Sequence, residues 1–136
     1  MPVLDSQVLF ALNPRDRFHQ RALKRLADLR ESKLKLYVPD TAILEFQVVL
    51  RSIDRGPETV RKAFLALHGA LELNGVTEVP TLDADLLMRQ CEIEEQYSLS
   101  YFDSLIAASS LRLNDQILSD DTSFDEVPNL ARTSLT

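Results

Sequence analysis

Short apolar segments alternate with longer amphipathic segments along the chain, and this alternation restricts the fold more than any other feature of the sequence. The apolar segments at 3–4, 36–38 and 116–119 are too short for helices and are rich in Val, Ile and Leu. Longer segments with helical spacing lie between them. Strands that alternate with helices form parallel sheets with helices packed on the faces. The sequence therefore predicts an α/β fold, with a short parallel sheet covered by helices on both faces.

Apolar residues spaced by three or four positions mark the predicted helices. These helices cover residues 6–12, 16–32, about 41–51, 57–71, 83–97 and 100–114. Asp40 or Thr41 is expected to cap the third helix. In the fifth, the apolar stripe consists of Ala84, Leu87, Met88 and Cys91, which predicts that Cys91 lies in the core. Residues 76–80 are expected to form a short strand or an extended connection, and the tail from Ala131 an edge strand.

Composition limits the class of protein. A length of 136 residues with 45% hydrophobic content suits one core, so we expect a single domain over 1–136. The net charge of −6 argues against broad, sequence-independent nucleic-acid binding, although a local basic patch is compatible with it. The single cysteine excludes an internal disulfide, and signal-peptide features and membrane-length apolar stretches are absent from the sequence. We expect a cytoplasmic protein.

Four carboxylates lie beside or inside strongly apolar runs: Asp5, Glu45, Asp103 and Asp121. Asp5 and Asp121 follow predicted strands, whereas Asp103 lies in the first turn of one predicted helix and Glu45 in the second turn of another. In an open parallel sheet, the ends of strands and the starts of the following helices converge on one edge, where ligands bind. We therefore expect all four side chains to face one cleft.

Each of these acids also has a structural alternative. Ser100 and Asp103 have the spacing of a capping box, Asp5 can cap the helix that starts at residue 6 or 7, and Asp121 can form an Asx-type turn. Glu45 fits such a role poorly, because it has no basic neighbour one turn away and lies one residue too late for a capping box from Thr41. A buried acid of this kind usually has a distant partner or a function.

A cluster of carboxylates points to a bound cation. Like charges held close together stay ionised only if something neutralises them, so the cluster implies raised pKa values or a metal. Oxygen ligands suit hard cations such as Mg²⁺ or Mn²⁺, and Mg²⁺ commonly contacts phosphate oxygens. The sequence thus indicates a phosphodiester substrate.

Four segments, in order along nearly the whole chain, resemble those of PIN-domain proteins, and within that group the VapC-type toxin ribonucleases of prokaryotic toxin–antitoxin pairs. The segments are Val3-Leu4-Asp5-Ser6, Thr41 to Glu45, Tyr101-Phe102-Asp103-Ser104-Leu105-Ile106-Ala107-Ala108, and Ser119-Asp120-Asp121-Thr122-Ser123-Phe124. The order and spacing of these segments carry the resemblance more than any single motif does.

The resemblance implies a metal-dependent endoribonuclease with Asp5, Glu45, Asp103 and Asp121 as its catalytic acids. It implies that Asp5 and Asp103 are the firmest ligands of Mg²⁺, with Mn²⁺ also plausible, and that Glu45 and Asp121 complete the site directly or through metal-bound water. The number of ions, one or two, stays open. Orientation of carboxylates by Ser6 and Ser119 is a further implication. The expected partners are an RNA substrate, a cognate antitoxin protein and a second copy of the chain in a homodimer.

Several alternatives stay open. Asp120 or Asp121 can face the site, and the spacing to Phe124 favours Asp121. Arg15, Arg17, Arg51 and Arg55 are candidate phosphate contacts or solvated charges. His19 and His68 lack metal-ligand spacing and are expected on the surface. A phosphoaspartyl phosphatase, which would also place an Asp at the end of a strand, is disfavoured because its usual second Asp two residues later is replaced here by Gln7. The chain can also be an RNA-processing PIN nuclease that is not a toxin, or a module that binds RNA or protein without cleavage.

Overall fold

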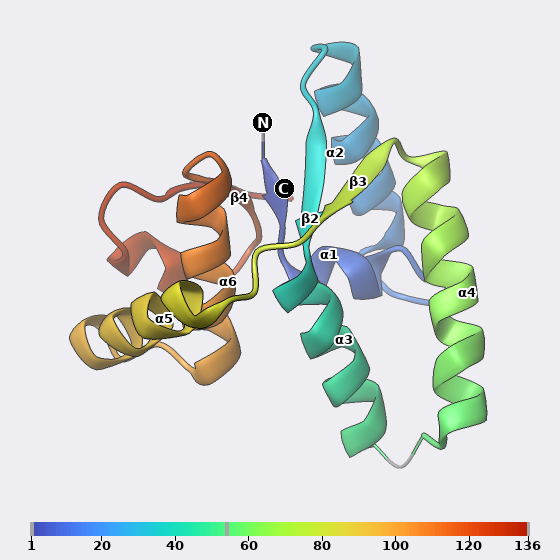
Figure 1. Ribbon diagram of the computed structural model, residues 1–136. Coiled ribbons are helices and arrows are strands. Elements are labelled where there is room, and N and C mark those ends of the chain that lie inside the picture. The colour runs from blue at the N-terminus through green and yellow to red at the C-terminus, as the bar shows by residue number, and fades with distance from the viewer. Residues whose placement is uncertain (1, 54, 136) are drawn as a thin grey trace.

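All strands of the sheet run parallel. The computed structural model describes residues 2–53 and 55–135, which form a five-stranded sheet in the order β3-β2-β1-β4-β5 (Figure 1). The strands are β1 (Val3–Leu4), β2 (Leu36–Pro39), β3 (Val76–Val79), β4 (Gln116–Leu118) and β5 (Ala131–Thr133). The predicted α/β class is confirmed, and so is the edge strand in the tail.

Six α-helices and one 3₁₀ helix are present in the described residues. They are α1 (Ser6–Ala11), α2 (His19–Glu31), α3 (Asp40–Ser52), α4 (Pro57–Leu73), α5 (Ala84–Tyr97), α6 (Tyr101–Leu113) and η1 (Thr122–Glu126). The predicted helices are all found, but α2 starts three residues later than expected because the carboxylate of Asp16 accepts a hydrogen bond from the Phe18 N–H and holds a turn there.

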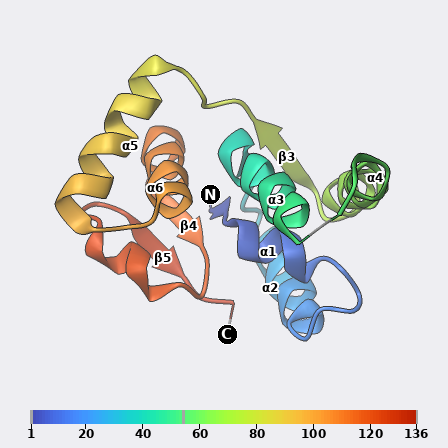
Figure 2. The ribbon, with the colours of Figure 1, turned by 90° about the horizontal axis from the view of Figure 1, so that it is seen from below.

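The helices divide between the two faces according to the strand order. The chain moves outward from β1 to β2 and β3, then returns across the sheet to β4 on the other side of β1. Crossovers between parallel strands are right-handed, so α1 to α4 lie on one face and α5 and α6 on the opposite face. Figure 2 shows these two groups on either side of the sheet. The strand order reverses at β1, which opens a crevice at the carboxyl ends of β1 and β4.

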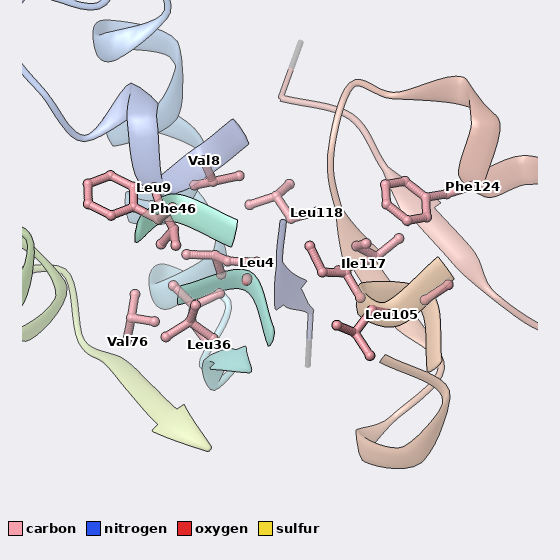
Figure 3. Close-up of a cluster of buried hydrophobic side chains, with 14 of the residues drawn as sticks. Leu4, Val8, Leu9, Leu36, Phe46, Val76, Leu105, Ile117, Leu118 and Phe124 are labelled. Atoms are coloured by element: carbon pink, nitrogen blue, oxygen red, sulfur yellow. The ribbon is translucent and has the colours of Figure 1, made fainter. Parts of the chain in front are cut away.

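The core forms one continuous cluster on the two faces of the sheet. Leu4 of β1 and Ile117 and Leu118 of β4 are fully buried, and they meet residues from helices on both sides (Figure 3). Phe124 of η1 is fully buried beside them and fixes the segment that follows β4. The central strands are thus anchored immediately before the residues at the carboxyl edge.

The buried face of α5 differs from the prediction. Leu86, Gln90 and Ile93 are buried, whereas Met88 is 64% exposed and Cys91 is exposed, so the prediction of a core cysteine was wrong. The reason is a polar contact with α6: the Gln90 amide donates to Ser104 Oγ at 3.0 Å. Hydrophobicity alone assigns a glutamine to the surface. The predicted buried face therefore contained Leu87 and Cys91, each one residue after the buried Leu86 and Gln90.

Buried hydroxyl groups join α3 to α6. Thr41 Oγ1 lies 2.7 Å from Ser109 Oγ, and Thr81 Oγ1 lies 2.9 Å from the same atom. The carboxylate of Asp40 accepts from the Thr81 N–H and hydroxyl, so neither Asp40 nor Thr41 caps α3, whose N-cap is Pro39. The predicted cap is therefore corrected. These side chains instead hold the start of α3 against α6.

Ser109→Ala is expected to destabilise the protein by about 1–3 kcal/mol, because it leaves the buried Thr41 hydroxyl without this partner. Ser110→Ala is the matched control. Ser110 is also fully buried, but its hydroxyl donates to the Ile106 carbonyl within α6, so its loss is expected to cost under about 1 kcal/mol. Urea unfolding measures both, and equal costs would contradict a special role for the bond between helices.

No helix in the described part of the chain is both long and apolar enough to span a bilayer.

Candidate active site

Asp5 occupies the junction between β1 and α1. Its N–H donates to the Leu118 carbonyl of β4 at 3.2 Å, which fixes the backbone at the crevice. The side chain is 4% exposed, and its two oxygens accept from Ser119 Oγ at 2.7 Å and from the Ser6 N–H at 2.7 Å. Asp5 is thus the expected cap of α1. Its position also presents a nearly buried carboxylate to the crevice.

The pKa of Asp5 is raised from 3.8 to about 7, mainly by burial. The hydrogen bonds from Ser119 and Ser6 oppose this rise, and the negative charges of Glu45 and Asp103 contribute to it. Since Asp5 is close to fully buried, removal of water is the dominant cause. Near neutral pH, the free protein therefore holds Asp5 partly protonated, and a cation that displaces this proton gains a strong ligand.

Glu45 lies in the second turn of α3 and is half-buried. The Ser6 hydroxyl donates a hydrogen bond to Glu45 Oε1, so one residue of α1 contacts both acids. Burial raises the pKa of Glu45, and the charges of Asp103 and Asp121 add to the effect. As expected from the sequence, Glu45 forms no ion pair with a basic side chain among the described residues.

Asp103 occupies the first turn of α6. Its N–H donates to Ser100 Oγ at 3.2 Å, so the expected cap of α6 is present. Burial raises the pKa of Asp103, a hydrogen bond with Ser100 lowers it, and the charge of Asp121 raises it. The capping interaction therefore explains the position of Asp103. Its half-buried carboxylate is still destabilised in the ionised form by burial and by the charge of Asp121.

Asp121 and Asp120 follow β4 and have different partners. Asp121 is exposed and caps η1, where its Oδ1 accepts from the Ser123 N–H at 2.9 Å and from the Ser123 hydroxyl at 2.7 Å. Asp120 Oδ1 accepts from Ser134 Oγ and the Leu135 N–H. The expected Asx-type turn is thus formed by Asp121, while Asp120 bonds to the C-terminal segment.

One pocket of about 380 Å³ collects these acids at the carboxyl edge of the sheet. It is lined by Asp5, Ser6, Gln7, Phe10, Glu45, Asp103, Asp120 and Asp121. All four predicted acids are brought together, although their catalytic role remains a prediction. The charges of Asp120 and Asp121 also act on Arg132, which lies outside the pocket lining. The pKa of Arg132 is raised mainly by its hydrogen bond to Asp125 and to a lesser extent by the charges of Asp120 and Asp121.

Two lining residues were missed as site residues by the sequence reasoning. Gln7 was considered only as a missing acid, yet its Oε1 accepts from the Asp120 N–H at 2.9 Å. Phe10 lies one turn beyond Ser6 on α1, and its ring centroid is 4.7 Å from that of Phe46. Helical spacing of four residues from Ser6 was the available signal for Phe10, and no comparable signal pointed to Gln7. The histidines lie elsewhere: His19 is half-buried and contacts the Ala11 carbonyl, and His68 is exposed near Glu72 and Glu78.

The donor set suits a hard divalent cation. The lining residues supply carboxylate, hydroxyl and amide oxygens, and none of them is Lys, Arg or His. Within the described residues, no three His, Cys, Asp or Glu side chains are gathered closely enough to hold an ion by themselves. Mg²⁺ typically takes one or two carboxylates and several waters, so a set of three is not required. The residues present therefore fit such an ion.

Comparison with solved structures shows proteins of similar fold. VapBC2 from Rickettsia felis, in a crystal structure with a promoter DNA fragment, matches with a TM-score of 0.72 and 17% identity over 97% of this chain and 96% of that one. A toxin–antitoxin complex from Klebsiella pneumoniae gives a TM-score of 0.67 and 14% identity over 100% and 98%. VapC20 from Mycobacterium tuberculosis, described as a sarcin–ricin loop cleaving toxin, gives 0.65 and 21% over 92% and 93%.

At these identities the three structures establish the fold alone. No curated protein sequence matches the chain significantly. A family model described as PIN domain matches residues 3–130, which include all four acids of the pocket. The chain therefore belongs to the PIN-domain family.

Proposed function

We propose that this protein is a metal-dependent endoribonuclease and the toxin of a toxin–antitoxin pair. The observation that carries the proposal is the convergence of Asp5, Glu45, Asp103 and Asp121, from four separate segments, on one pocket without a basic lining residue. Each acid is positioned by its own local structure, yet burial and mutual repulsion raise the pKa values of three of them. Such a costly arrangement is typical of functional sites.

Asp5 and Asp103 are the proposed metal ligands, with Mg²⁺ the expected ion and Mn²⁺ a substitute. When bound, the ion makes water more acidic and stabilises negative charge on a phosphate. Glu45, which is half-buried and fixed by Ser6, is suited to orient the attacking water and accept its proton. Asp121, which accepts hydrogen bonds from Ser123, completes the acidic cluster.

Ser6 and Ser119 hold the carboxylates in place. Ser119 Oγ donates to Asp5 and accepts from the Asp121 N–H at 3.0 Å, so one hydroxyl links two of the acids. The Ser6 hydroxyl contacts Glu45, and the Ser6 N–H contacts Asp5. We propose that these two serines orient the carboxylates, as residues that hydrogen-bond to metal ligands do in metal sites generally.

The RNA substrate is proposed to contact exposed arginines. Arg15, Arg17, Arg51 and Arg55 are all exposed, and the Arg17 guanidinium lies 4.6 Å from the ring centroid of Phe18. With a net charge of −6, the chain offers few phosphate contacts of this kind, so we expect selective rather than general affinity for RNA.

An antitoxin is the proposed regulatory partner. A second cavity of about 620 Å³ lies between α1, α2, α3 and α4, and Phe10 lines both this cavity and the acidic pocket. Its lining is mostly apolar, including Leu9, Phe46 and Leu67. An antitoxin segment with an apolar face suits this cavity, and its continuation would cover the acids. We also propose a homodimer, supported by the exposed Leu82, Leu87 and Met88 near and on α5.

The proposal is tested by cleavage of labelled single-stranded RNAs with Mg²⁺ or Mn²⁺. We expect wild-type protein to cut one or more RNAs, EDTA to stop the reaction, and Asp103→Asn to be inactive. Glu95→Gln, which removes an exposed charge on α5, is the matched control and should cut like the wild type. Cutting by Asp103→Asn at the wild-type rate would show that this pocket is not the nuclease site.

A further inference from the structure

The turn that carries the last acid is bound to the C-terminal segment. Asp120 Oδ1 accepts from Ser134 Oγ at 2.7 Å and from the Leu135 N–H at 2.8 Å, while the Ser119 N–H donates to the Thr133 carbonyl at 3.0 Å. Leu135 is buried in the core and anchors the segment. The match to the family model ends at residue 130, so Ser134 and Leu135 lie outside it.

Two further side chains hold the same turn. Gln7 Oε1 accepts from the Asp120 N–H, which ties the turn to α1. Arg132 donates to the Ser119 carbonyl at 3.2 Å and forms an ion pair with Asp125 at 2.9 Å, which ties it to β5 and η1. The turn is therefore restrained from α1 on one side and from the tail on the other.

The position of this turn affects the acids directly. The Asp121 N–H donates to Ser119 Oγ, and Ser119 Oγ donates to Asp5 Oδ2. A shift of residues 119–121 would therefore move Asp121 and loosen the hydroxyl that holds Asp5. Misplacement of reacting groups by about 1 Å can reduce a rate by roughly 100-fold.

We propose that Asp120 is a positioning residue, which with Ser134 and Leu135 clamps the 119–121 turn, so that Ser119 keeps its hydrogen bond to Asp5 and Asp121 keeps its place in the pocket. The effect on cleavage rests on the proposed nuclease function, whereas the clamp itself does not. The two neighbouring acids then have separate roles. Asp121 belongs to the site, and Asp120 uses its oxygen to hold the tail.

Asparagine substitutions separate the two acids. Asp120→Asn keeps an oxygen that can accept from Ser134 and Leu135, so we expect its kcat to stay within about threefold of wild type. Asp121→Asn should lower kcat far more. Asp120→Ala and Ser134→Ala should each lower kcat about tenfold with little change in KM. Because the two side chains share one hydrogen bond, the kcat of the double variant should not fall below that of the less active single variant. Equal losses in Asp120→Asn and Asp121→Asn would overturn the assignment.

Amide hydrogen exchange tests the clamp without activity. We expect exchange of the Ser119 and Asp121 N–H groups to accelerate about tenfold in Asp120→Ala and Ser134→Ala but not in Asp120→Asn. Leu130→Ala, which removes a buried side chain nearby without touching the clamp, controls for general destabilisation. Unchanged exchange in the two alanine variants would overturn the clamp, whereas an inactive wild type would overturn only the nuclease proposal.

Discussion

Replacing Asp5 with Asn is expected to abolish RNA cleavage and to stabilise the metal-free protein at pH 8 by about 2 to 4 kcal/mol. The pKa of Asp5 rises from 3.8 to about 7 on folding, mainly because the carboxyl loses water. One pKa unit corresponds to about 1.4 kcal/mol, so ionisation of this group costs the folded state roughly 4 kcal/mol. Asparagine removes the charge, and imperfect replacement of the hydrogen bond from Ser119 reduces the gain.

The direction of the pH dependence follows from the raised pKa. Between pH 3.8 and about 7, folded Asp5 keeps a proton that the unfolded chain has released, so stability falls as pH rises through this window. The contribution of Asp5 is fully present below pH 3.8 and lost above about 7. From pH 5.5 to 8 the loss amounts to roughly 2 kcal/mol. Asp5→Asn should not show this component.

Urea unfolding at pH 5.5 and 8 in EDTA measures the effect. Wild type and Glu95→Gln, which removes an exposed charge, should both lose stability with rising pH, while Asp5→Asn should change less. The same samples are then assayed for cleavage with Mn²⁺. Parallel pH profiles in all three proteins would contradict a buried, destabilising Asp5. An active Asp5→Asn would contradict its role as a metal ligand.

The sequence predicted the carboxyl edge of the sheet well, because the relevant signals are local. Asp5 directly follows the apolar run that forms β1, and Asp103 lies three residues after the cap Ser100, so their places on the elements follow from short segments. Topology then brings them together, since parallel strands share one edge. The caps proposed as alternatives to function are also present, so a capping interaction does not by itself argue for or against a role in the site.

The errors occurred where distant residues decide the structure. Gln90 is buried because Ser104 on another helix accepts from its amide, and this contact turned α5 away from the predicted face. Asp40 binds Thr81 in place of capping α3. The choice between Asp120 and Asp121 likewise depends on the tail, which lies 14 residues beyond Asp120 at Ser134. Neither hydrophobic periodicity nor capping rules contain information about such contacts.

Addition of Mn²⁺ at pH 8 is expected to stabilise the wild type by about 2.7 kcal/mol when the free ion is at 100 times its dissociation constant. We expect the ion to bind the folded state, where the acids converge, because the unfolded chain has no such site. Because the ion displaces the proton from Asp5, the stabilisation should grow as pH rises from 5.5 to 8. EDTA should reverse it completely.

Variants separate specific binding from screening of the negative charges. Asp5→Asn and Asp103→Asn should lose most of the Mn²⁺ effect, Glu45→Gln part of it, and Glu95→Gln none. Sodium chloride at matched ionic strength should stabilise all five proteins to a similar, smaller extent, because salt screens exposed charges without occupying the pocket. Equal stabilisation of wild type and Asp103→Asn by Mn²⁺ would mean that the ion binds elsewhere. Loss in both aspartate variants, with Glu95→Gln unaffected, would place the ion between β1 and α6, where the proposed reaction requires it.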